Sequence, residues 1–393
     1  MKIVMTGGGS GGHITPILAV AHKIKQLNPN TQVIYFGQKG DKFGAIVSEH
    51  NIIDGVRFIH AGKFRRYHGQ GLAQLLDFGT MRRNMVDSLK VIAGFFESLR
   101  LMRQVRPDVV FCKGGYVGVP VGLAAALLRI PYVTHDSDAM PGLANRLIAR
   151  WAAKHAVAMD VKLYPYPKEK TISVGVPVSG EHKPVSSADK QSFRRSLGID
   201  QYKHIVLVTG GGLGAFRLNQ AFVQHAKTLL EALPSTCVIH TTGQLHEKEV
   251  SEQYTKLLPK DKRSQVIVRG FVNNIHQYSG AADIVVARGG ATSFAELAQQ
   301  AKPTIIVPNP LLTGGHQLKN AIAYTEKNAA ICVTEEQIEE DSAVLVDQTI
   351  ALLKDDLKQA ELSDSIREFA HPDATLQLAK IILSCAADRT GKK

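Results

Sequence analysis

Short apolar runs alternate with glycine turns and amphipathic stretches along the chain. The first apolar run, at residues 2–5, leads into a glycine-rich segment at 7–12 and then into a stretch with helical periodicity at 15–27. Continuous apolar strands joined through helices are typical of a parallel sheet that is covered on both faces. The first half therefore predicts a helix at 123–128 and further strands at 31–36, 107–111 and 131–135.

The same pattern begins again in the second half. An apolar run at 204–209 precedes a glycine turn at 210–214 and a helical stretch at 219–230. The two glycine turns lie about half a chain length apart, so they indicate two similar units. We predict an α/β fold with two Rossmann-like, doubly wound parallel-sheet domains. Further strands of the second domain are expected at 236–240, 266–268, 283–287 and 304–307.

The domain boundary is predicted from a change in composition. Pro, Gly and Ser cluster between residues 175 and 187, which indicates a linker. We expect an N-terminal domain at 1–178 and a C-terminal domain at 179–370. A last helix, which begins near Pro372 and ends near Ala387, forms a separate segment at 371–393 with a polar tail.

Composition narrows the class of protein. The chain of 393 residues has a formal net charge of +12, which fits nucleic acid, an anionic membrane or an anionic substrate. Nucleic acid is disfavoured, because no RNP, KH, zinc-finger or helix-turn-helix signature occurs and aromatic residues make up only 6%. The four cysteines form no CxxC pair, which fits a reducing compartment. We expect no signal peptide and no membrane-spanning helix, because no apolar run reaches the ~18 residues needed.

The first glycine turn contains the pattern G-x-G-x-x-G at Gly7, Gly9 and Gly12. Such glycines let backbone amides approach a phosphate at a helix N-terminus, although they also serve tight packing alone. An NAD-type oxidoreductase needs an acidic residue after the second strand, and that strand ends here in Tyr35-Phe36-Gly37. This alternative is therefore disfavoured. A Walker-type NTPase is disfavoured as well, because no GK[ST] follows either turn.

Two positions near the predicted strand ends are candidate proton acceptors. His13 directly follows the first glycine turn and has the chemistry to accept a proton from a substrate hydroxyl. Asp136 and Asp138 form a D-x-D pattern after the strand at 131–135, where α/β sheets bind their ligands. A helix cap before Pro141 and a divalent metal site are the alternatives for these acids. We favour a polar or basic role for Asp136 over metal binding.

The second half has its own candidate binding residues. Backbone amides after Arg288, with the hydroxyl of Ser293, are suited to a diphosphate, and Glu296 lies one helical turn further on. The carboxylate of Glu296 suits paired ribose hydroxyls, while a capping role is the alternative for Ser293 and Glu296. His316 and Gln317 carry groups that suit sugar hydroxyls.

Residues 64–106 differ from the rest of the chain. Apolar residues such as Met81, Met85 and Phe96 are interleaved with basic ones such as Arg82 and Arg100. Such a segment can rest on an anionic bilayer, or it can form ordinary amphipathic core helices.

The order of these motifs resembles the MurG family, bacterial GT-B glycosyltransferases of peptidoglycan synthesis. The matching segments cover nearly the whole chain and read GGGSGGHITP (7–16), KGGYVGVP (113–120), PGLANRLIAR (141–150), GGGLGAFRLN (210–219), RGGATSFAEL (288–297), HQLKNA (316–321) and HPDATLQLAKII (371–382). Each motif alone is weak, whereas the ordered set is specific.

The resemblance implies a fold with two domains that face a cleft, and an inverting hexosyltransferase. N-acetylglucosamine would pass from UDP-N-acetylglucosamine to the 4-hydroxyl of the muramyl sugar of undecaprenyl-diphosphate-linked lipid I, and lipid II would form. The N-terminal domain would bind the acceptor and face the membrane, and the C-terminal domain would bind the UDP-sugar. The enzyme would be peripheral, on the cytoplasmic side of the inner membrane, with an anionic membrane surface, lipid I and other cell-wall synthesis proteins as partners. No cofactor and no metal is expected.

The resemblance also implies roles for single residues. His13 or Asp136 would be the catalytic base. Acceptor-binding residues would be Gly9, Gly114, Gly115, Tyr116 and Asn145. Donor-binding residues would be Ser10, Gly11, Gly12, Asp138, Ser179, Gly212, Leu213, Gly214, Phe271, Val272, Ser293, Glu296, His316 and Gln317.

The chain departs from the family pattern at three motifs. The family's HEQN reads His135-Asp136-Ser137-Asp138, GGSQG reads Gly211-Gly212-Leu213-Gly214, and GNPVR reads Gly175-Val176-Pro177-Val178-Ser179. A related GT-B enzyme with another lipid acceptor and a non-catalytic nucleotide-sugar sensor remain as alternatives.

Overall fold

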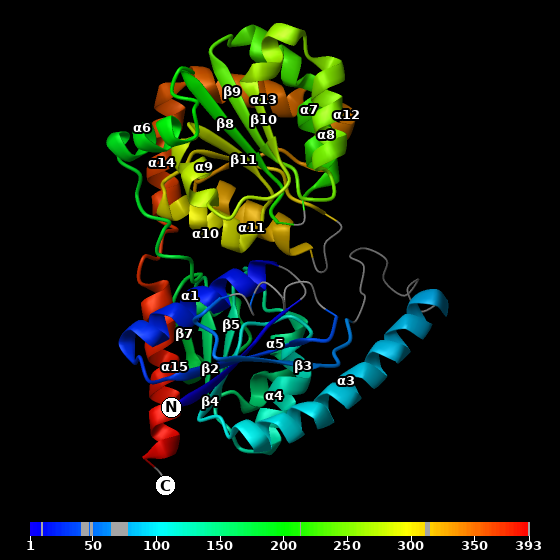
Figure 1. Cartoon of the computed structure of the whole chain (residues 1–393), viewed down its shortest axis with the longest axis vertical. Helices are drawn as coiled ribbons and strands as arrows, with labels where there is room; N and C mark the ends of the chain where they lie inside the picture. Colours follow the sequence, from blue (N-terminus) through cyan, green and yellow to red (C-terminus); the bar gives the residue numbers. More distant parts are fainter. Residues whose placement is uncertain are drawn as a thin grey trace. The chain divides into compact units, whose positions relative to one another are not determined.

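The structure, a computed structural model, describes residues 1–8, 11–40, 47, 50–63, 78–212, 214–310 and 315–391. The described chain divides into two compact units. The first contains Met1–Gly180, Leu311–His316 and His371–Lys393, and the second contains Glu181–Pro310 together with Gln317–Ala370. Each unit has its own parallel sheet, and Figure 1 shows helices on the faces of both.

The sheet of the first unit has the strand order β3-β2-β1-β4-β5-β6-β7. Its central strands are continuous apolar runs, as expected for strands that are buried on both faces. All the strand pairs are parallel, and Val4 of β1 lies between Ile34 of β2 and Val110 of β4. The strands are β1 (Lys2–Thr6), β2 (Gln32–Gln38), β3 (Gly55–Ile59), β4 (Val109–Cys112), β5 (Tyr132–Asp136), β6 (Lys154–Val157) and β7 (Thr171–Ser173).

Helices cover both faces of this sheet. One face packs against α1 (Gly11–Leu27) and α15 (Ala374–Thr390), which contact each other. The other face packs against α3 (Phe78–Val105), α4 (Gly118–Leu127) and α5 (Leu143–Ile148). Short 3₁₀ turns complete the unit at Ala149–Trp151, Val161–Leu163 and Lys168–Lys170.

Helix α15 joins the first unit although almost two hundred residues separate it from Gly180, where the N-terminal stretch of that unit ends. Leu378 and Ile382 are fully buried among residues of β1 and α1. The Thr375 hydroxyl donates a hydrogen bond to the Val178 carbonyl over 2.9 Å, and Arg389 donates one to the Pro107 carbonyl. The segment that was predicted as a separate helix and tail thus contributes to the core of the first unit.

Helix α3 has an unusual distribution of apolar residues. The face that packs on α4 includes the buried Leu99 and Met102. The opposite face is also apolar: Met85, Leu89, Ile92 and Phe96 recur at helical spacing, and each is more than half exposed. Of the predicted membrane-facing segment, residues 64–77 lie outside the described residues.

The second unit has the strand order β10-β9-β8-β11-β12-β13. Helices α7, α8 and α13 pack on one face over a core that includes Phe222 and Val286. The strands are β8 (His204–Thr209), β9 (Thr236–Thr241), β10 (Val266–Arg269), β11 (Ile284–Ala287), β12 (Thr304–Ile306) and β13 (Ile331–Cys332). The helices are α6 (Ser187–Ser196), α7 (Phe216–Ala232), α8 (Glu247–Leu257), the 3₁₀ helix Lys260–Gln265, α9 (Ile275–Ala281), α10 (Ala291–Gln299), α11 (His316–Thr325), α12 (Glu335–Glu340), α13 (Val344–Lys354) and α14 (Asp356–Arg367).

The predicted fold class is confirmed, since both units are Rossmann-like, doubly wound parallel sheets. In each sheet the order of strands reverses beside the first strand, between β1 and β4 in the first unit and between β8 and β11 in the second. Ligands of doubly wound sheets bind at the carboxyl ends of the strands at this reversal. Both glycine turns follow these first strands directly, so both candidate sites lie at the expected edge.

Candidate active site

Two glycine turns meet at the carboxyl edge of the first sheet. Gly7 and Gly8 follow β1, and Gly114 and Gly115 follow β4 with φ of 108° and 77°. A side chain at Gly115 would overlap the carbonyl oxygen of Gly8, so the two turns touch backbone to backbone. Positive φ and close approach both require glycine here, and they leave the backbone open to a ligand.

The predicted acceptor-binding residues Gly114, Gly115, Tyr116 and Asn145 lie around these turns. Asn145 of α5 is buried, and its side-chain amide donates to the His135 carbonyl over 2.9 Å. The Tyr116 hydroxyl lies 2.5 Å from Gln38 at the end of β2. Gly9 lies outside the described residues.

His13 lies in the first turn of α1, because this helix begins at Gly11 and not near Thr15 as predicted. Gly11 and Gly12 are therefore its first two residues. The Nε2 atom of His13 is 3.8 Å from the position that a Cβ of Gly114 would occupy, so the imidazole lies against the second glycine turn. Loss of hydration, with the nearby charge of Lys113, lowers the pKa of the half-buried His13 to about 4. The imidazole is therefore neutral at pH 7 and can accept a proton.

Asp136, the last residue of β5, is held by structural hydrogen bonds. One carboxylate oxygen accepts from the Gly142 backbone over 2.9 Å, and the other accepts from the Tyr166 hydroxyl over 2.8 Å. Burial raises the pKa of Asp136 above its usual range, although these bonds oppose the shift. Both oxygens hold the loop after β5, which suits a positioning role better than free proton transfer.

Lys113 is a residue of this site that the sequence analysis did not single out. It stands between β4 and the Gly114-Gly115 turn and is only 2% exposed. Its ammonium donates to the Ser137 hydroxyl over 2.8 Å. The sequence feature that could have pointed to this residue is a lysine directly before a pair of glycines. Its burial is visible only in the folded structure.

Asp138 and Ser179, which were predicted to bind the donor, also belong to the first unit. Asp138 follows β5, and its backbone carbonyl accepts a hydrogen bond from the Tyr164 hydroxyl over 2.8 Å. Ser179 is the penultimate residue before the chain leaves this unit. Ser10 lies outside the described residues.

The second glycine turn connects β8 to α7 at the edge of the second sheet. Gly211 and Gly214 have φ of 76° and 77°, and a side chain at Gly214 would overlap the Thr242 carbonyl. A Cβ at Gly212 would lie 3.6 Å from the ring of Phe271, which is 49% exposed. Phe271 and Val272 follow β10 and therefore lie near this turn. Leu213 lies outside the described residues.

Glu296 and Ser293 lie on α10, directly after the turn that follows β11. Helix α10 begins after Gly290 without a side-chain cap, so its first amides are not satisfied by a capping side chain. Glu296 is half-buried, and no hydrogen bond or ion pair of its carboxylate occurs among the described residues. Burial raises the pKa of Glu296 to about 7.

Helix α11 supplies His316 and Gln317, its first two residues. Gln317 is buried, and its side-chain carbonyl accepts from the Asn309 backbone over 2.9 Å. A Cβ at Gly289 would lie 2.9 Å from the Gln317 carbonyl, so the start of α11 packs tightly on the turn after β11. This packing brings Gln317 beside the turn that carries Ser293.

A buried ion pair supports the edge of the second sheet, and the sequence analysis missed it. Arg288 follows β11, and its guanidinium lies 2.6 Å from the carboxylate of Glu335 on α12. Glu335 also contacts Arg217 of α7 over 2.9 Å. One carboxylate thus links the turn after β11 to the helix that follows the glycine turn after β8. Its partners are far apart in sequence, so no local signal could have identified it.

Known proteins match this chain along nearly its whole length. The models of the glycosyltransferase family 28 N-terminal and C-terminal domains match residues 3–157 and 205–378. The Bacillus cereus protein named UDP-N-acetylglucosamine–N-acetylmuramyl-(pentapeptide) pyrophosphoryl-undecaprenol N-acetylglucosamine transferase 1 is 30% identical over 386 residues, which cover 97% of this chain and 98% of the relative. The transferase of that name from Halalkalibacterium halodurans is 34% identical over 341 residues, covering 87% and 88%. The chain belongs to the MurG family of glycosyltransferases.

Structure agrees with sequence on the MurG-family fold. The crystal structure of Acinetobacter baumannii MurG matches with a TM-score of 0.69 at 23% identity, covering 98% of this chain and 99% of that one. The predicted glycosyltransferase class is confirmed. The two candidate edges fall one in each family domain, because Gly7 to Asn145 lie in the first matched range and Gly210 to Gln317 in the second.

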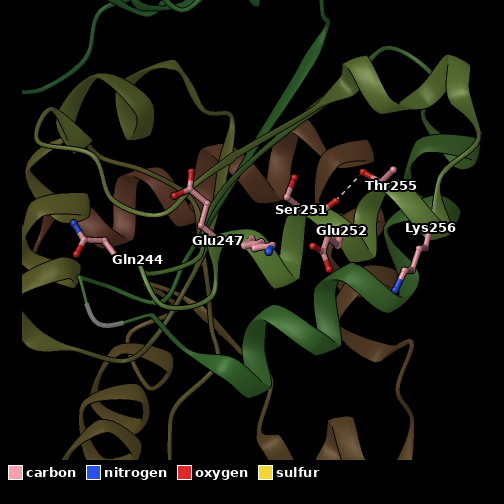
Figure 2. Close-up of a pocket in the computed structure, with 7 residues that line it drawn as sticks. Gln244, Glu247, Ser251, Glu252, Thr255 and Lys256 are labelled. Carbon is pink, nitrogen blue, oxygen red and sulfur yellow. Dashed lines mark hydrogen bonds between the residues drawn. The ribbon is translucent and has the colours of Figure 1, made fainter.

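Other features of the MurG-family chain do not form part of this site. A shallow pocket of about 520 Å³ runs along α8, and Figure 2 shows its polar and charged lining: Gln244, Glu247, Lys248, Ser251, Glu252, Thr255 and Lys256. None of the predicted site residues lines it.

No group of three or more His, Cys, Asp or Glu suited to a metal occurs in the described part of the chain. In that same part, no helix is both long enough and apolar enough to cross a membrane.

Proposed function

We propose that the protein transfers N-acetylglucosamine from UDP-N-acetylglucosamine to the 4-hydroxyl of the muramyl sugar of lipid I, so that lipid II forms. The relatives that align along nearly the whole chain are named for transfer of this sugar to an undecaprenyl-diphosphate-linked muramyl pentapeptide. The observation that carries the proposal is the carboxylate of Glu296, which has no partner among the described residues and lies on the helix that follows the glycine turn after β11.

The donor occupies the edge of the second sheet in this proposal. Glu296 accepts hydrogen bonds from the paired ribose hydroxyls, which supply the partners that its carboxylate lacks. Backbone amides of the 211–214 turn and of the start of α10, with the Ser293 hydroxyl, bind the diphosphate. Phe271 and Val272 contact uracil. The imidazole of His316 and the amide of Gln317 bind the sugar.

The acceptor binds at the edge of the first sheet, near Gly114, Gly115, Tyr116 and Asn145. His13 takes the proton of the 4-hydroxyl, because its imidazole is neutral at pH 7 and lies against the Gly114 turn. The oxygen then forms a bond to C1 of the donor sugar on the face opposite UDP. The bond between C1 and the phosphate oxygen breaks, its electron pair leaves with UDP, and the configuration at C1 inverts.

Asp136 positions the loop after β5 in this scheme. Its two oxygens already accept hydrogen bonds from Gly142 and Tyr166, so His13 is the better candidate for the base. The departing UDP is stabilised by backbone amides and the uncapped starts of α7 and α10, and no metal takes part.

The exposed face of α3 is proposed to rest on the membrane that contains the acceptor. Met85, Leu89, Ile92 and Phe96 supply the apolar stripe, and basic residues of the same helix, including Arg100 and Arg103, attract anionic lipids. In this proposal the protein is a peripheral enzyme on the cytoplasmic side of the inner membrane.

Labelled UDP-N-acetylglucosamine, supplied with lipid I or with diacylglycerol, tests the proposal. We expect label in the polyprenyl product only, and equal turnover with and without a chelator. Transfer to diacylglycerol would contradict the acceptor, and UDP binding without any turnover would indicate a sensor. Thermal protection by UDP but not by NAD(H) is expected, and the reverse would restore the oxidoreductase alternative.

A further inference from the structure

Lys113 carries a buried positive charge that forms no ion pair with any residue in the part of the chain that the structure describes. Its side chain is 2% exposed, and its one side-chain hydrogen bond among the described residues goes to the neutral Ser137 hydroxyl. No ion pair of Lys113 occurs among those residues. An ammonium group in the interior is strongly unfavourable unless an anion compensates its charge. The charge of Lys113 therefore has no direct counter-ion among the residues described.

The two acids whose charge acts on Lys113 form no ion pair with it among the described residues. Both carboxylate oxygens of Asp136 accept hydrogen bonds from other groups, namely the Gly142 backbone and the Tyr166 hydroxyl. The charges of Asp136 and Asp138 act on Lys113 and partly offset the effect of burial on its pKa. Burial lowers the pKa of Lys113 to about 8, so most of the ammonium is charged at neutral pH.

The surroundings of Lys113 suit an anion with several oxygens. The lysine adjoins the Gly114-Gly115 turn, and its Cβ lies 3.1 Å from the position that a Cβ of Gly7 would occupy. The first turn of α1 contains no acidic residue. The buried Oδ1 of Asn145, beside Gly114, has no hydrogen-bond partner among the described residues, and it can accept a hydrogen bond from a sugar hydroxyl next to the anion but not from the anion itself.

We propose that Lys113 supplies the positive charge that balances the diphosphate of the lipid acceptor at the edge of the first sheet. The identity of that acceptor rests on the proposed function. Glycine-turn amides, a helix N-terminus and a lysine together are typical of phosphate recognition, whereas a single carboxylate is usually bound by fewer donors. The charge acts at short range through an interior of low dielectric, where it is stronger than in water.

Two diphosphates are available to the enzyme, that of the lipid and that of UDP. Lys113 belongs to the unit whose edge carries His13 and Asn145, so the lipid diphosphate is its ligand in this proposal. The test uses farnesyl diphosphate as the lipid probe, farnesol as its uncharged counterpart, and UDP as the donor probe. Dissociation constants are measured by calorimetry on the full chain, and the KM for lipid I and for the donor is measured in turnover.

The variants are Lys113→Met and Lys113→Gln, with Lys168→Met as the control, because Lys168 is exposed in the same unit. Both Lys113 variants should weaken farnesyl diphosphate binding about tenfold or more and raise the KM for lipid I, since a charge-assisted contact is lost. Affinity for UDP should stay within about twofold. The melting temperature should stay equal or rise, because an uncompensated buried charge is removed.

Three other outcomes would overturn the inference, and a fourth would overturn only the proposed function. If a folded variant bound farnesyl diphosphate with unchanged affinity, Lys113 would not be part of the acceptor site. If the variants lost affinity for UDP alone, Lys113 would bind the diphosphate of the donor. A fall in melting temperature with equal loss of both affinities would give Lys113 a purely structural role. If farnesyl diphosphate binding depends on Lys113 but lipid I is never glycosylated, the diphosphate site holds and the proposed acceptor fails.

Discussion

Arg288 and Glu335 form an ion pair of 2.6 Å in which both side chains are at most 10% exposed. The pair joins the turn after β11 to helix α12, and Arg288 also donates to the Val307 carbonyl at the end of β12. Glu335 has a second basic partner in Arg217 at the start of α7. The two turns that we assign to the donor diphosphate are thus fixed by one carboxylate from outside the site.

Glu335→Ala should therefore reduce both stability and donor binding. Removal of one partner leaves Arg288 charged and buried, which costs about 3 kcal/mol in the free energy of unfolding. UDP affinity, measured by calorimetry, should fall severalfold because the turn at Gly289-Gly290 loses its support. Glu336→Ala is the matched control, because Glu336 is the exposed neighbour on the same helix. Equal UDP affinity in wild type and Glu335→Ala would show that the ion pair does not support the donor site.

Glu296 should give donor binding its pH dependence. With a pKa near 7, its carboxyl group becomes protonated as the pH falls below 7, and it then accepts ribose hydroxyls less well. UDP affinity should decrease by up to about tenfold per pH unit below that pKa. Glu296→Gln should bind UDP weakly at every pH, whereas Glu252→Gln on α8 should behave as wild type. A wild-type affinity that is constant from pH 5 to 8 would contradict this role.

The same residue should lower stability at alkaline pH. A carboxyl group whose pKa is raised on folding favours the folded state below its unfolded pKa of 4.5, and this contribution is lost as the pH rises through 7. Glu296→Gln should thus be more stable than wild type at pH 8, by about 3 kcal/mol at most, and equal to it near pH 4. Urea unfolding at the two pH values measures the difference. A variant that is less stable at pH 8 would mean that the carboxylate has stabilising partners in the folded chain.

His13→Ala should reduce kcat about a hundredfold or more while UDP affinity stays unchanged, because it removes the proton acceptor and no donor contact. Since burial holds the pKa of His13 near 4, its protonation should not limit activity between pH 5 and 8. His22→Ala, an exposed histidine on the same helix, is the control. Near-normal kcat in His13→Ala would transfer the role of base to Asp136, and Asp136→Asn would then be the decisive variant.

The double substitution Leu89→Ser with Phe96→Ser should release the protein from vesicles. Each side chain contributes about 1–2 kcal/mol of apolar burial in a bilayer, so binding to vesicles with anionic lipid should fall about a hundredfold. Turnover of a water-soluble acceptor analogue should remain at the wild-type level, since α3 carries no residue of the proposed site. Leu127→Ser, an exposed leucine on α4, is the control. Unchanged sedimentation with vesicles would contradict a membrane contact through α3.

Sequence patterns predict the parts of this molecule that depend on local chemistry. The glycine turns at 7–12 and 210–214 were predicted to follow buried strands, because backbone turns at a sheet edge favour glycine. The strand predicted at 204–209 has the same bounds in the structure. The predicted start of α1 at Thr15 was wrong, because Gly11 and Gly12 belong to its first turn. Roles of the site residues stay predictions, although the fold brings Gly114, Asn145 and His13 together.

Long-range relationships were not accessible from the sequence. Lys113 meets Ser137 only because β4 and β5 are neighbours, and Arg288 meets Glu335 across almost fifty residues. The helix at Ala374–Thr390 was expected from its periodicity, but nothing local shows that Leu378 packs beside β1. Such contacts follow from the order of strands, which a hydropathy pattern does not specify.

The packing of α15 has a consequence for how the protein is made. The core beside β1 and α1 is closed by a helix that the ribosome produces only after the entire second unit. At ordinary rates of synthesis the interval is on the order of ten seconds or more, during which apolar side chains such as Ile17 and Val20 lack their final cover. The nascent chain therefore has a period in which chaperones can engage its first half. The second unit, whose residues are contiguous apart from residues 311–316, can complete its own core before the first unit does.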